Sequence, residues 1–79
     1  MKVTVLVRPK EGVLDPQGEA VLGAVRHLGF DVSEVRMGRV VDIDVAGADP
    51  EQARADVERM CEQLLVNPLI ESFEIEVHN

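Results

Sequence analysis

Cys61 is the only thiol in the sequence and the first candidate for nucleophilic chemistry. It lies between Val57 and Leu64 in an apolar stripe at helical spacing. The histidines, His27 and His78, have no Ser, Cys or metal-ligand partner near them in the sequence. A cysteine buried in apolar surroundings keeps its proton and is unreactive. We therefore expect Cys61 to be a packing residue, and we expect neither a nucleophilic centre nor a metal site.

A phosphate-binding loop would be expected in segment 8–18, after the first strand. Arg8 and Lys10 have the charge to attract an anion. The segment contains only Gly12 and Gly18, however, and lacks both the GxxxxGK and the GxGxxG spacing. An acylphosphatase-type enzyme would use this loop as an anion cradle. Acidic residues are abundant along the chain, but no pair is set apart from the others. These residues predict that the chain alone has no catalytic activity and holds no cofactor.

Composition limits the partners. The chain has 79 residues, a formal charge of −7 and 3% aromatic residues. Phosphate contacts need clustered Lys and Arg, and single strands need stacking aromatics, so we expect no nucleic-acid partner. No apolar run approaches the roughly 20 residues that cross a bilayer, so we expect no membrane span. With one cysteine and no signal-peptide pattern, a cytoplasmic location is the default expectation. The length predicts a single domain, 1–79, whose small core favours oligomerisation.

Periodicity predicts the elements that position these residues. Val3, Val5 and Val7 alternate with Thr4, Leu6 and Arg8, which predicts a strand with one β-branched face. Asp15-Pro16 is typical of a helix start, with Asp at the N-cap, and Gly29 is a plausible residue just after the helix ends. A second Asp-Pro start follows at residue 49. Its helix carries an apolar stripe of Ala53, Val57, Met60, Cys61 and Leu64, and ends before Asn67-Pro68. A last strand alternates through Phe73, Ile75 and Val77.

Segment 32–45 has period two and leaves two alternatives. A three-residue loop from Gly38 to Val40 pairs Met37 with Val41 and keeps the apolar faces consistent. One long bent strand also keeps them consistent, but it turns Arg39 inward. We favour the hairpin. The resulting order is strand, helix, strand, strand, helix, strand. It predicts an α+β two-layer sandwich related to the ferredoxin-like fold, with an antiparallel sheet and both helices on one face.

The second face of such a sheet has no helix to cover it. It is either solvated or a subunit surface on which opposed charges set the register. Uncovered edge strands are another route to association. The face would present Thr4, Leu6, Arg8, Glu34, Arg36, Asp42, Asp44, Glu74, Glu76 and His78.

Three segments resemble the PurS family: residues 12–18 (GVLDPQG), 35–39 (VRMGR) and 61–71 (CEQLLVNPLIE). The family is the small subunit of phosphoribosylformylglycinamidine synthase in purine biosynthesis. The resemblance implies a ligase complex that uses ATP, with magnesium, in its large synthetase subunit (PurL) and releases ammonia in its glutaminase subunit (PurQ). It implies that the small subunit bridges the two, supports ammonia transfer, contributes no catalytic group and forms a homodimer or homotetramer.

The candidate interface residues lie in or beside the matching segments, at loop or strand-end positions. Gly18 lies in the first turn of a helix, where glycine costs stability; either a close backbone approach by another element or subunit, or local flexibility, would explain it. The candidates are Lys10, Asp15, Gln17, Gly18, Arg36, Gly38 and Arg39. Two alternatives remain. An ACT-like regulatory domain that senses a small molecule shares the strand-helix order, and a small phosphatase would turn over acyl phosphate alone.

Overall fold

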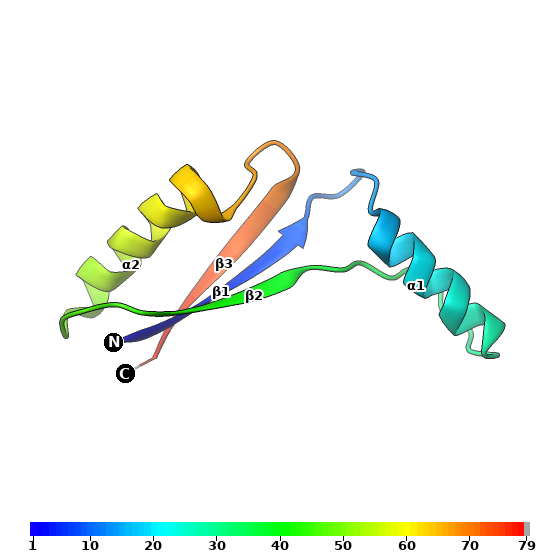
Figure 1. The fold of residues 1–79 in the computed structure, drawn as a ribbon, viewed down its shortest axis with the longest axis horizontal. Coiled ribbons are helices and arrows are strands. Elements are labelled where there is room, and N and C mark those ends of the chain that lie inside the picture. The colour runs from blue at the N-terminus through cyan, green and yellow to red at the C-terminus, as the bar shows by residue number, and fades with distance from the viewer. Residues whose placement is uncertain (79) are drawn as a thin grey trace.

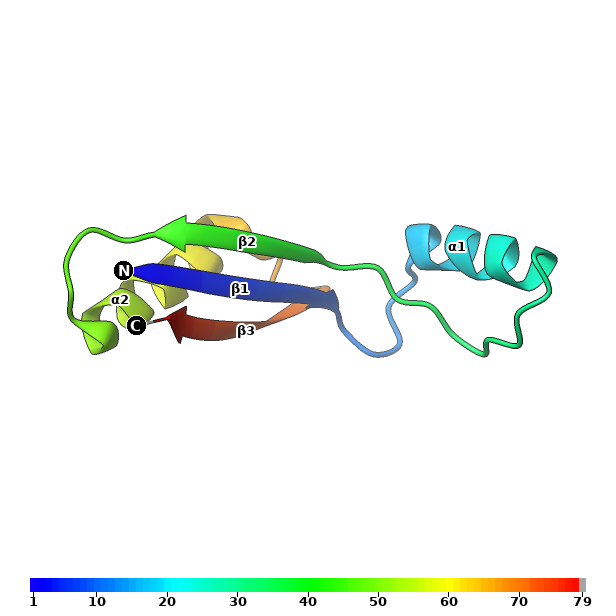
Figure 2. The ribbon, with the colours of Figure 1, turned by 90° about the horizontal axis from the view of Figure 1, so that it is seen from below.

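The computed structural model describes residues 1–78 and has an α+β architecture. Its elements are β1 (Lys2–Pro9), α1 (Pro16–His27), β2 (Arg39–Asp44), α2 (Pro50–Met60), the π-helical turn η1 (Cys61–Leu65) and β3 (Glu71–His78). The three strands form one antiparallel sheet in the order β2-β1-β3 (Figure 2). The predicted fold class, an antiparallel sheet with two helices, is therefore confirmed. Two of its details, the second hairpin strand and the position of α1, are wrong.

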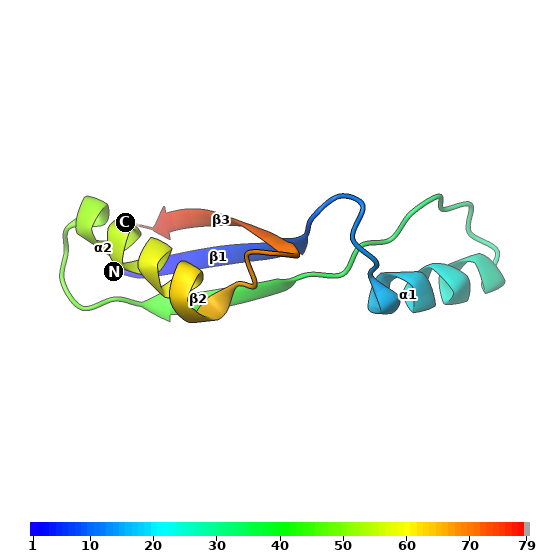
Figure 3. The ribbon, with the colours of Figure 1, turned by 90° about the horizontal axis from the view of Figure 1, so that it is seen from above.

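The core lies between the sheet and α2, which covers one face of it (Figures 1 and 3). In the register, Val5 of β1 lies opposite Val41 of β2 and Ile75 of β3, so the β-branched residues of all three strands share one face. The β1 valines are 0–1% exposed. The fully or largely buried side chains are Val3, Val5, Val7, Ala53, Val57, Cys61 and Val66.

The end of α2 departs from the predicted stripe. Ala53, Val57 and Cys61 are buried as expected, but Leu64 is 83% exposed. The cause is η1, in which the Val66 N–H reaches back five residues to the Cys61 carbonyl, at 3.1 Å. This wider turn rotates the following residues, so Val66 reaches the core instead of Leu64. Met60, at 37% exposed, also lies outside the core.

Helix α1 lies beyond the end of the sheet and covers neither of its faces (Figures 1 and 2). The molecule is consequently elongated, 48 × 25 × 14 Å. The helix limits follow the local signals: Asp15 is its N-cap, and Gly29 has a φ of +97° just after its end. The Gly29 and Phe30 N–H groups bond back to Arg26 and Val25, completing a Schellman motif. Local signals thus predicted where α1 begins and ends, but not where it lies.

No hairpin forms between residues 32 and 45. Residues 31–38, here called the return segment, run back from α1 toward the sheet outside any helix or strand, and β2 starts at Arg39. Gly38 lies in no turn, and its φ is not positive. It lies instead where the chain passes the end of β1. The single-strand alternative is right only in that the chain does not turn back at Gly38, because residues 39–44 alone form a strand. Arg39 does turn onto the inner face, opposite Val7.

The outer face of the sheet is uncovered and polar. Thr4 joins the three strands: its hydroxyl lies 2.9 Å from Asp42 on β2 and 2.9 Å from His78 Nε2 on β3. Arg8 bonds Glu74 at 3.1 Å. Glu34 and Arg36 were expected on this face but lie in the return segment, outside the sheet. Within residues 1–78, neither helix has the length and apolarity needed to span a membrane.

Candidate functional site

The candidate residues meet where α1 joins the sheet. Three segments converge there: residues 10–15 after β1, the return segment, and residues 66–70 before β3. Lys10 links the first to the third, because its backbone N–H donates to Ile70 O (2.8 Å) and its ammonium to Pro68 O (2.6 Å). We call this region the junction.

Asp15 uses both carboxylate oxygens at the junction. Oδ1 accepts from the Gly18 N–H at 3.1 Å, which is the N-cap bond of α1. Oδ2 accepts from the Met37 N–H at 2.8 Å, across 22 residues of sequence. The Met37 bond is the main cause that lowers the pKa of Asp15, and the Gly18 bond is the second. One ionised side chain therefore both starts α1 and ties it to the return segment.

Two glycines allow backbones to approach closely at the junction. A Cβ on Gly18 would fall far inside van der Waals distance of the Val35 carbonyl oxygen, and a Cβ on Gly38 would do the same to the Val7 carbonyl oxygen. Gly18 is also the one residue of α1 that is buried. The close-approach explanation proposed for Gly18 is therefore supported by the geometry.

The two candidate arginines have different surroundings. Arg36 donates to the Pro9 carbonyl, and its carboxylate neighbours Glu11 and Glu34 are 3.9 and 3.8 Å away. Arg39 forms a bidentate ion pair with Glu71 and also donates to the Leu65 carbonyl at the end of η1.

The Arg39–Glu71 pair ties three elements together. Its hydrogen bond is the main cause that raises the pKa of Arg39 and lowers the pKa of Glu71. The Asn67 N–H, 2.8 Å from the same carboxylate, lowers the pKa of Glu71 further. Arg39 therefore joins β2, η1 and β3.

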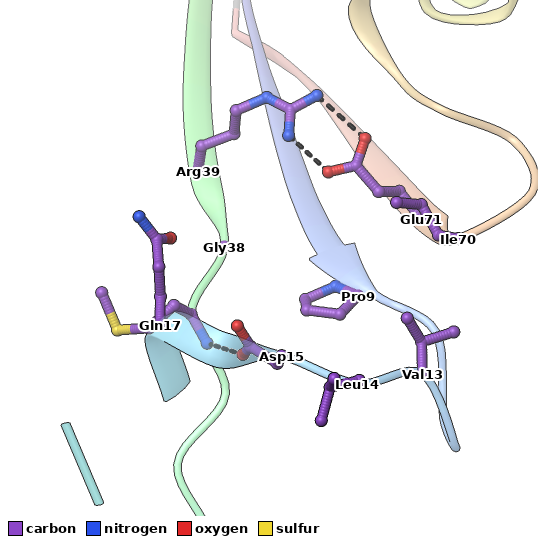
Figure 4. A pocket seen from close by; sticks show the side chains of 10 residues that line it. Pro9, Val13, Leu14, Asp15, Gln17, Gly38, Arg39, Ile70 and Glu71 are labelled. Carbon is purple, nitrogen blue, oxygen red and sulfur yellow. Dashed lines mark hydrogen bonds and ion pairs between the residues drawn. The ribbon is translucent and has the colours of Figure 1, made fainter. Parts of the chain in front are cut away.

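The junction encloses a hollow of about 220 Å³ (Figure 4). In Figure 4, the Arg39 and Glu71 side chains face each other from β2 and β3, the two outer strands of the sheet, on either side of β1. Four of the seven candidates line this hollow: Asp15, Gln17, Gly38 and Arg39. Lys10, Gly18 and Arg36 flank it. The remaining lining residues are Pro9, Val13, Leu14, Met37, Ile70 and Glu71.

The junction offers polar contacts and an apolar rim but no reactive group. The charged groups of Asp15, Arg39 and Glu71 are all bonded to other parts of the chain. Cys61 is 0% exposed, and burial, with Glu58 and Glu62 nearby, raises its pKa and keeps it protonated. No group of three or more potential metal ligands occurs in the described part of the chain. An open hollow with an exposed apolar rim, which includes Leu14 and Ile70, is suited to a protein contact.

Sequence reasoning missed Glu71 and Met37 as junction residues. Glu71 shares the parity of Phe73, so it had to lie on the inner face of β3, opposite the inward position of Arg39. That alternation was the available signal. Met37 takes part through its backbone N–H, for which residue type gives no signal.

Comparisons with known proteins agree with this geometry. The family model described as "PurS: Phosphoribosylformylglycinamidine (FGAM) synthase" matches residues 2–79. A phosphoribosylformylglycinamidine synthase subunit PurS from Methanocaldococcus jannaschii is 42% identical over 77 residues, covering 96% of this chain and 93% of that protein.

Solved structures show the same fold. A Bacillus subtilis PurS structure superposes with a TM-score of 0.86 at 39% identity, covering 99% of this chain and 98% of the other. A chain in the structure of PurLQS from Thermotoga maritima gives a TM-score of 0.87 at 33% identity, covering 95% and 93%. The match extends over all three segments that first suggested the resemblance and over every element of the fold, and the chain belongs to the PurS family.

Proposed function

We propose that this chain is the small, non-catalytic subunit of phosphoribosylformylglycinamidine synthase. In this role it assembles the large ATP-dependent synthetase subunit with the glutaminase subunit and supports ammonia transfer between them. ATP and magnesium belong to the large subunit. The complex is cytoplasmic. Family membership over residues 2–79 carries this proposal, and the PurLQS structure from Thermotoga maritima supports it.

The form of the chain suits assembly. A subunit that bridges two enzymes needs surface more than a pocket, and this one is 48 Å long with α1 extended beyond its sheet. Large apolar side chains remain exposed at the junction and along α1, where single exposed residues would need no explanation but a group does. They include Leu14, Leu28, Phe30, Leu69 and Ile70, which are 45–83% exposed.

A second copy of the chain is part of this proposal. Helix α2 packs on β1 and β3, and β2 is an edge strand of the sheet. Val41 and Ile43 of β2, and Val45 just after it, are only half-buried. Helix α1 carries Val21, Leu22 and Val25 on a face that packs extensively against none of the strands. Each chain thus lacks a helix over β2 and a strand along its edge.

A two-fold related copy can supply both parts. Its return segment would pair with β2, and its α1 would cover the half-buried Val41, Ile43 and Val45. Each sheet would then have four strands and two helices, the ferredoxin-like arrangement that the sequence predicts for one chain. Exchange of an identical element is a common route to dimers. Further pairing of dimers through the outer faces would give a tetramer.

Reconstitution tests the assembly role. The purified large subunit and glutaminase, mixed with substrate, ATP and magnesium, should form little amidine from glutamine until this chain is added. Ammonium chloride in place of glutamine should give product without the chain, because that reaction needs no transfer between subunits. The chain alone should hydrolyse neither ATP nor glutamine. Full glutamine-driven rates without the chain would refute the proposal.

A second measurement separates the proposal from a sensing module. A ligand that binds only the native state raises the free energy of unfolding by RT ln(1 + [L]/Kd). Amino acids and nucleotides should therefore leave the unfolding temperature of the isolated chain unchanged. A ligand-dependent rise, together with no effect on the synthase, would favour the ACT-like alternative.

A further inference from the structure

The orientation of α1 depends on few contacts. The helix does not rest on the sheet, so only its first turn and the return segment hold its direction. In the first turn, the contacts to the return segment are the Asp15–Met37 bond and the Gly18–Val35 approach. Arg26 ties the other end of α1 to the return segment through the Val32 carbonyl, at 2.9 Å. That second contact moves with α1, so it does not determine the angle between α1 and the sheet.

Asp15 and Asp49 show that capping and orientation are separate tasks. Both are N-caps followed by proline. Asp49 accepts a local bond from the Glu51 N–H at 3.0 Å, and the direction of α2 is set by its buried side chains. Asp15 accepts a local bond and, through its other oxygen, the Met37 bond. Of the two Asp15 bonds, only the Met37 bond connects the start of α1 to the return segment.

We propose that Asp15 is a positioning residue for assembly: its bond to the Met37 N–H holds α1 at the angle at which it reaches a second copy of the chain. The inference rests on the exchanged dimer of the proposed function. The carboxylate does this because it has two acceptor oxygens at the junction, and α1 capping occupies only one. An asparagine keeps the cap, since Asn and Asp are equivalent there. Its amide nitrogen would then face the Met37 N–H, donor against donor.

Asp15→Asn, with Asp49→Asn as the matched control, tests the proposal. Both variants lose one carboxylate from a helix start, so both lose the same favourable term with the helix dipole. Both should fold with the circular dichroism of the wild type. Sedimentation should show a dimer dissociation constant raised about tenfold or more for Asp15→Asn, as expected for the loss of one charge-assisted hydrogen bond. Asp49→Asn should stay within about twofold of the wild type.

Met37→Pro breaks the same bond from the other side. Proline removes the N–H donor in a segment that is in neither a helix nor a strand, while the α1 cap stays intact. It should weaken the dimer as Asp15→Asn does, and the double variant should add little, because both substitutions remove one interaction. Additive effects would indicate two unrelated defects and would overturn the proposal.

Activity gives a third readout. In the reconstituted synthase, Asp15→Asn should require more chain for half-maximal glutamine-driven rate yet reach the wild-type maximum. A lower maximum with unchanged affinity would contradict a positioning role.

Failure of the dimer and failure of the positioning role are distinguishable. If the wild type sediments as a monomer, the exchanged dimer is wrong, and small-angle scattering of the monomer still tests the bond. Asp15→Asn should then broaden the distribution of maximum dimensions relative to Asp49→Asn. Unchanged dissociation constants in the dimer, or unchanged scattering in the monomer, would overturn the assignment to Asp15.

Discussion

Helices α1 and α2 begin with the same local signal and have different surroundings. Each starts with Asp-Pro, and each aspartate caps the first turn. Helix α2 buries Ala53 and Val57 against the sheet, whereas the only buried residue of α1 is a glycine. One sequence signal thus gives a helix that completes the core and another that extends beyond it. Helix limits are therefore local properties, while helix position depends on which surface is available, and in the proposed dimer that surface belongs to a second copy.

An aspartate on each helix should have the largest effect and should separate the two roles. Val57→Asp places a carboxylate at a position 0% exposed, which costs several kcal/mol of the roughly 5–15 kcal/mol that hold small domains folded, so the chain should fail to fold. Val25→Asp lies on the unpartnered face of α1 and should fold normally but sediment as a monomer. Circular dichroism and sedimentation check both results. A dimeric Val25→Asp variant would show that α1 is not part of the interface.

A methyl group on two glycines of α1 should give the next largest effect. Gly18→Ala forces the return segment to shift, because the new Cβ would meet the Val35 carbonyl, and such overpacking costs about 1–3 kcal/mol. Gly23→Ala has open space and should stabilise α1 by up to about 1 kcal/mol. Native-state hydrogen exchange should show faster exchange of the α1 amides in the first variant and slower exchange in the second, with α2 unchanged. Equal behaviour of the two variants would mean that the close approach at Gly18 does not matter.

Two substitutions with smaller effects separate folding from association. Cys61→Ala removes a little buried volume and should lower the free energy of unfolding by about 1 kcal/mol while preserving assembly and synthase activity. Leu28→Ala changes a side chain that is 73% exposed and should leave the unfolding of the single chain within about 0.5 kcal/mol while weakening the dimer. Urea unfolding at one fixed protein concentration measures the effect on stability, and sedimentation measures the effect on the dimer. Loss of activity in a folded Cys61→Ala variant would contradict its packing role.

The same contrast explains what the sequence could predict. Alternation identified the inner face of all three strands, and Asp-Pro with Gly29 marked the limits of α1, because these signals depend on neighbouring residues. The hairpin at Gly38 was wrong because its pairing is satisfied within one chain only if α1 folds back. Nothing in residues 32–45 says whether the partner strand comes from the same chain. The π-turn at Cys61 was missed because spacing alone does not reveal an extra residue in a helical turn.

The candidate site could also be predicted only in part. Asp15, Gln17, Gly38 and Arg39 were selected from the family resemblance and do line one hollow. Their roles as interface residues stay predictions. Arg39 was selected as a surface charge, yet its partners are Glu71 and the Leu65 carbonyl within the chain, which follows from the inward parity it takes once β2 is a continuous strand. Arg36 keeps more distant charged neighbours and is the better candidate for an intersubunit contact.

Acid should have the smallest of these effects. It acts through Glu71, whose partner Arg39 also binds the end of η1, directly after α2. The Arg39 hydrogen bond, followed by the Asn67 N–H, holds the pKa of Glu71 below its usual value. A carboxyl group with a lowered folded pKa stabilises the fold above its unfolded pKa, about 4.3 for Glu, and this contribution is lost as pH falls through the folded value. Stability should therefore decline below about pH 4. Asp15 and Asp56, whose pKa values are also lowered, contribute to that decline.

Glu71→Gln isolates one part of the acid effect. The variant should be less stable than the wild type near neutral pH and should approach it in acid, because the amide cannot lose a stabilising charge that it never had. Glu76→Gln removes a carboxylate from the outer face of the same strand and controls for net charge. Urea midpoints between about pH 3 and 7 should converge for wild type and Glu71→Gln as the pH falls. The difference stays small because Arg39 is partly exposed and the pair is screened by solvent. If the urea midpoints of wild type and Glu71→Gln ran parallel with pH while those of wild type and Glu76→Gln converged, the acid-sensitive contact would lie on the outer face of the sheet and not at the Arg39–Glu71 pair.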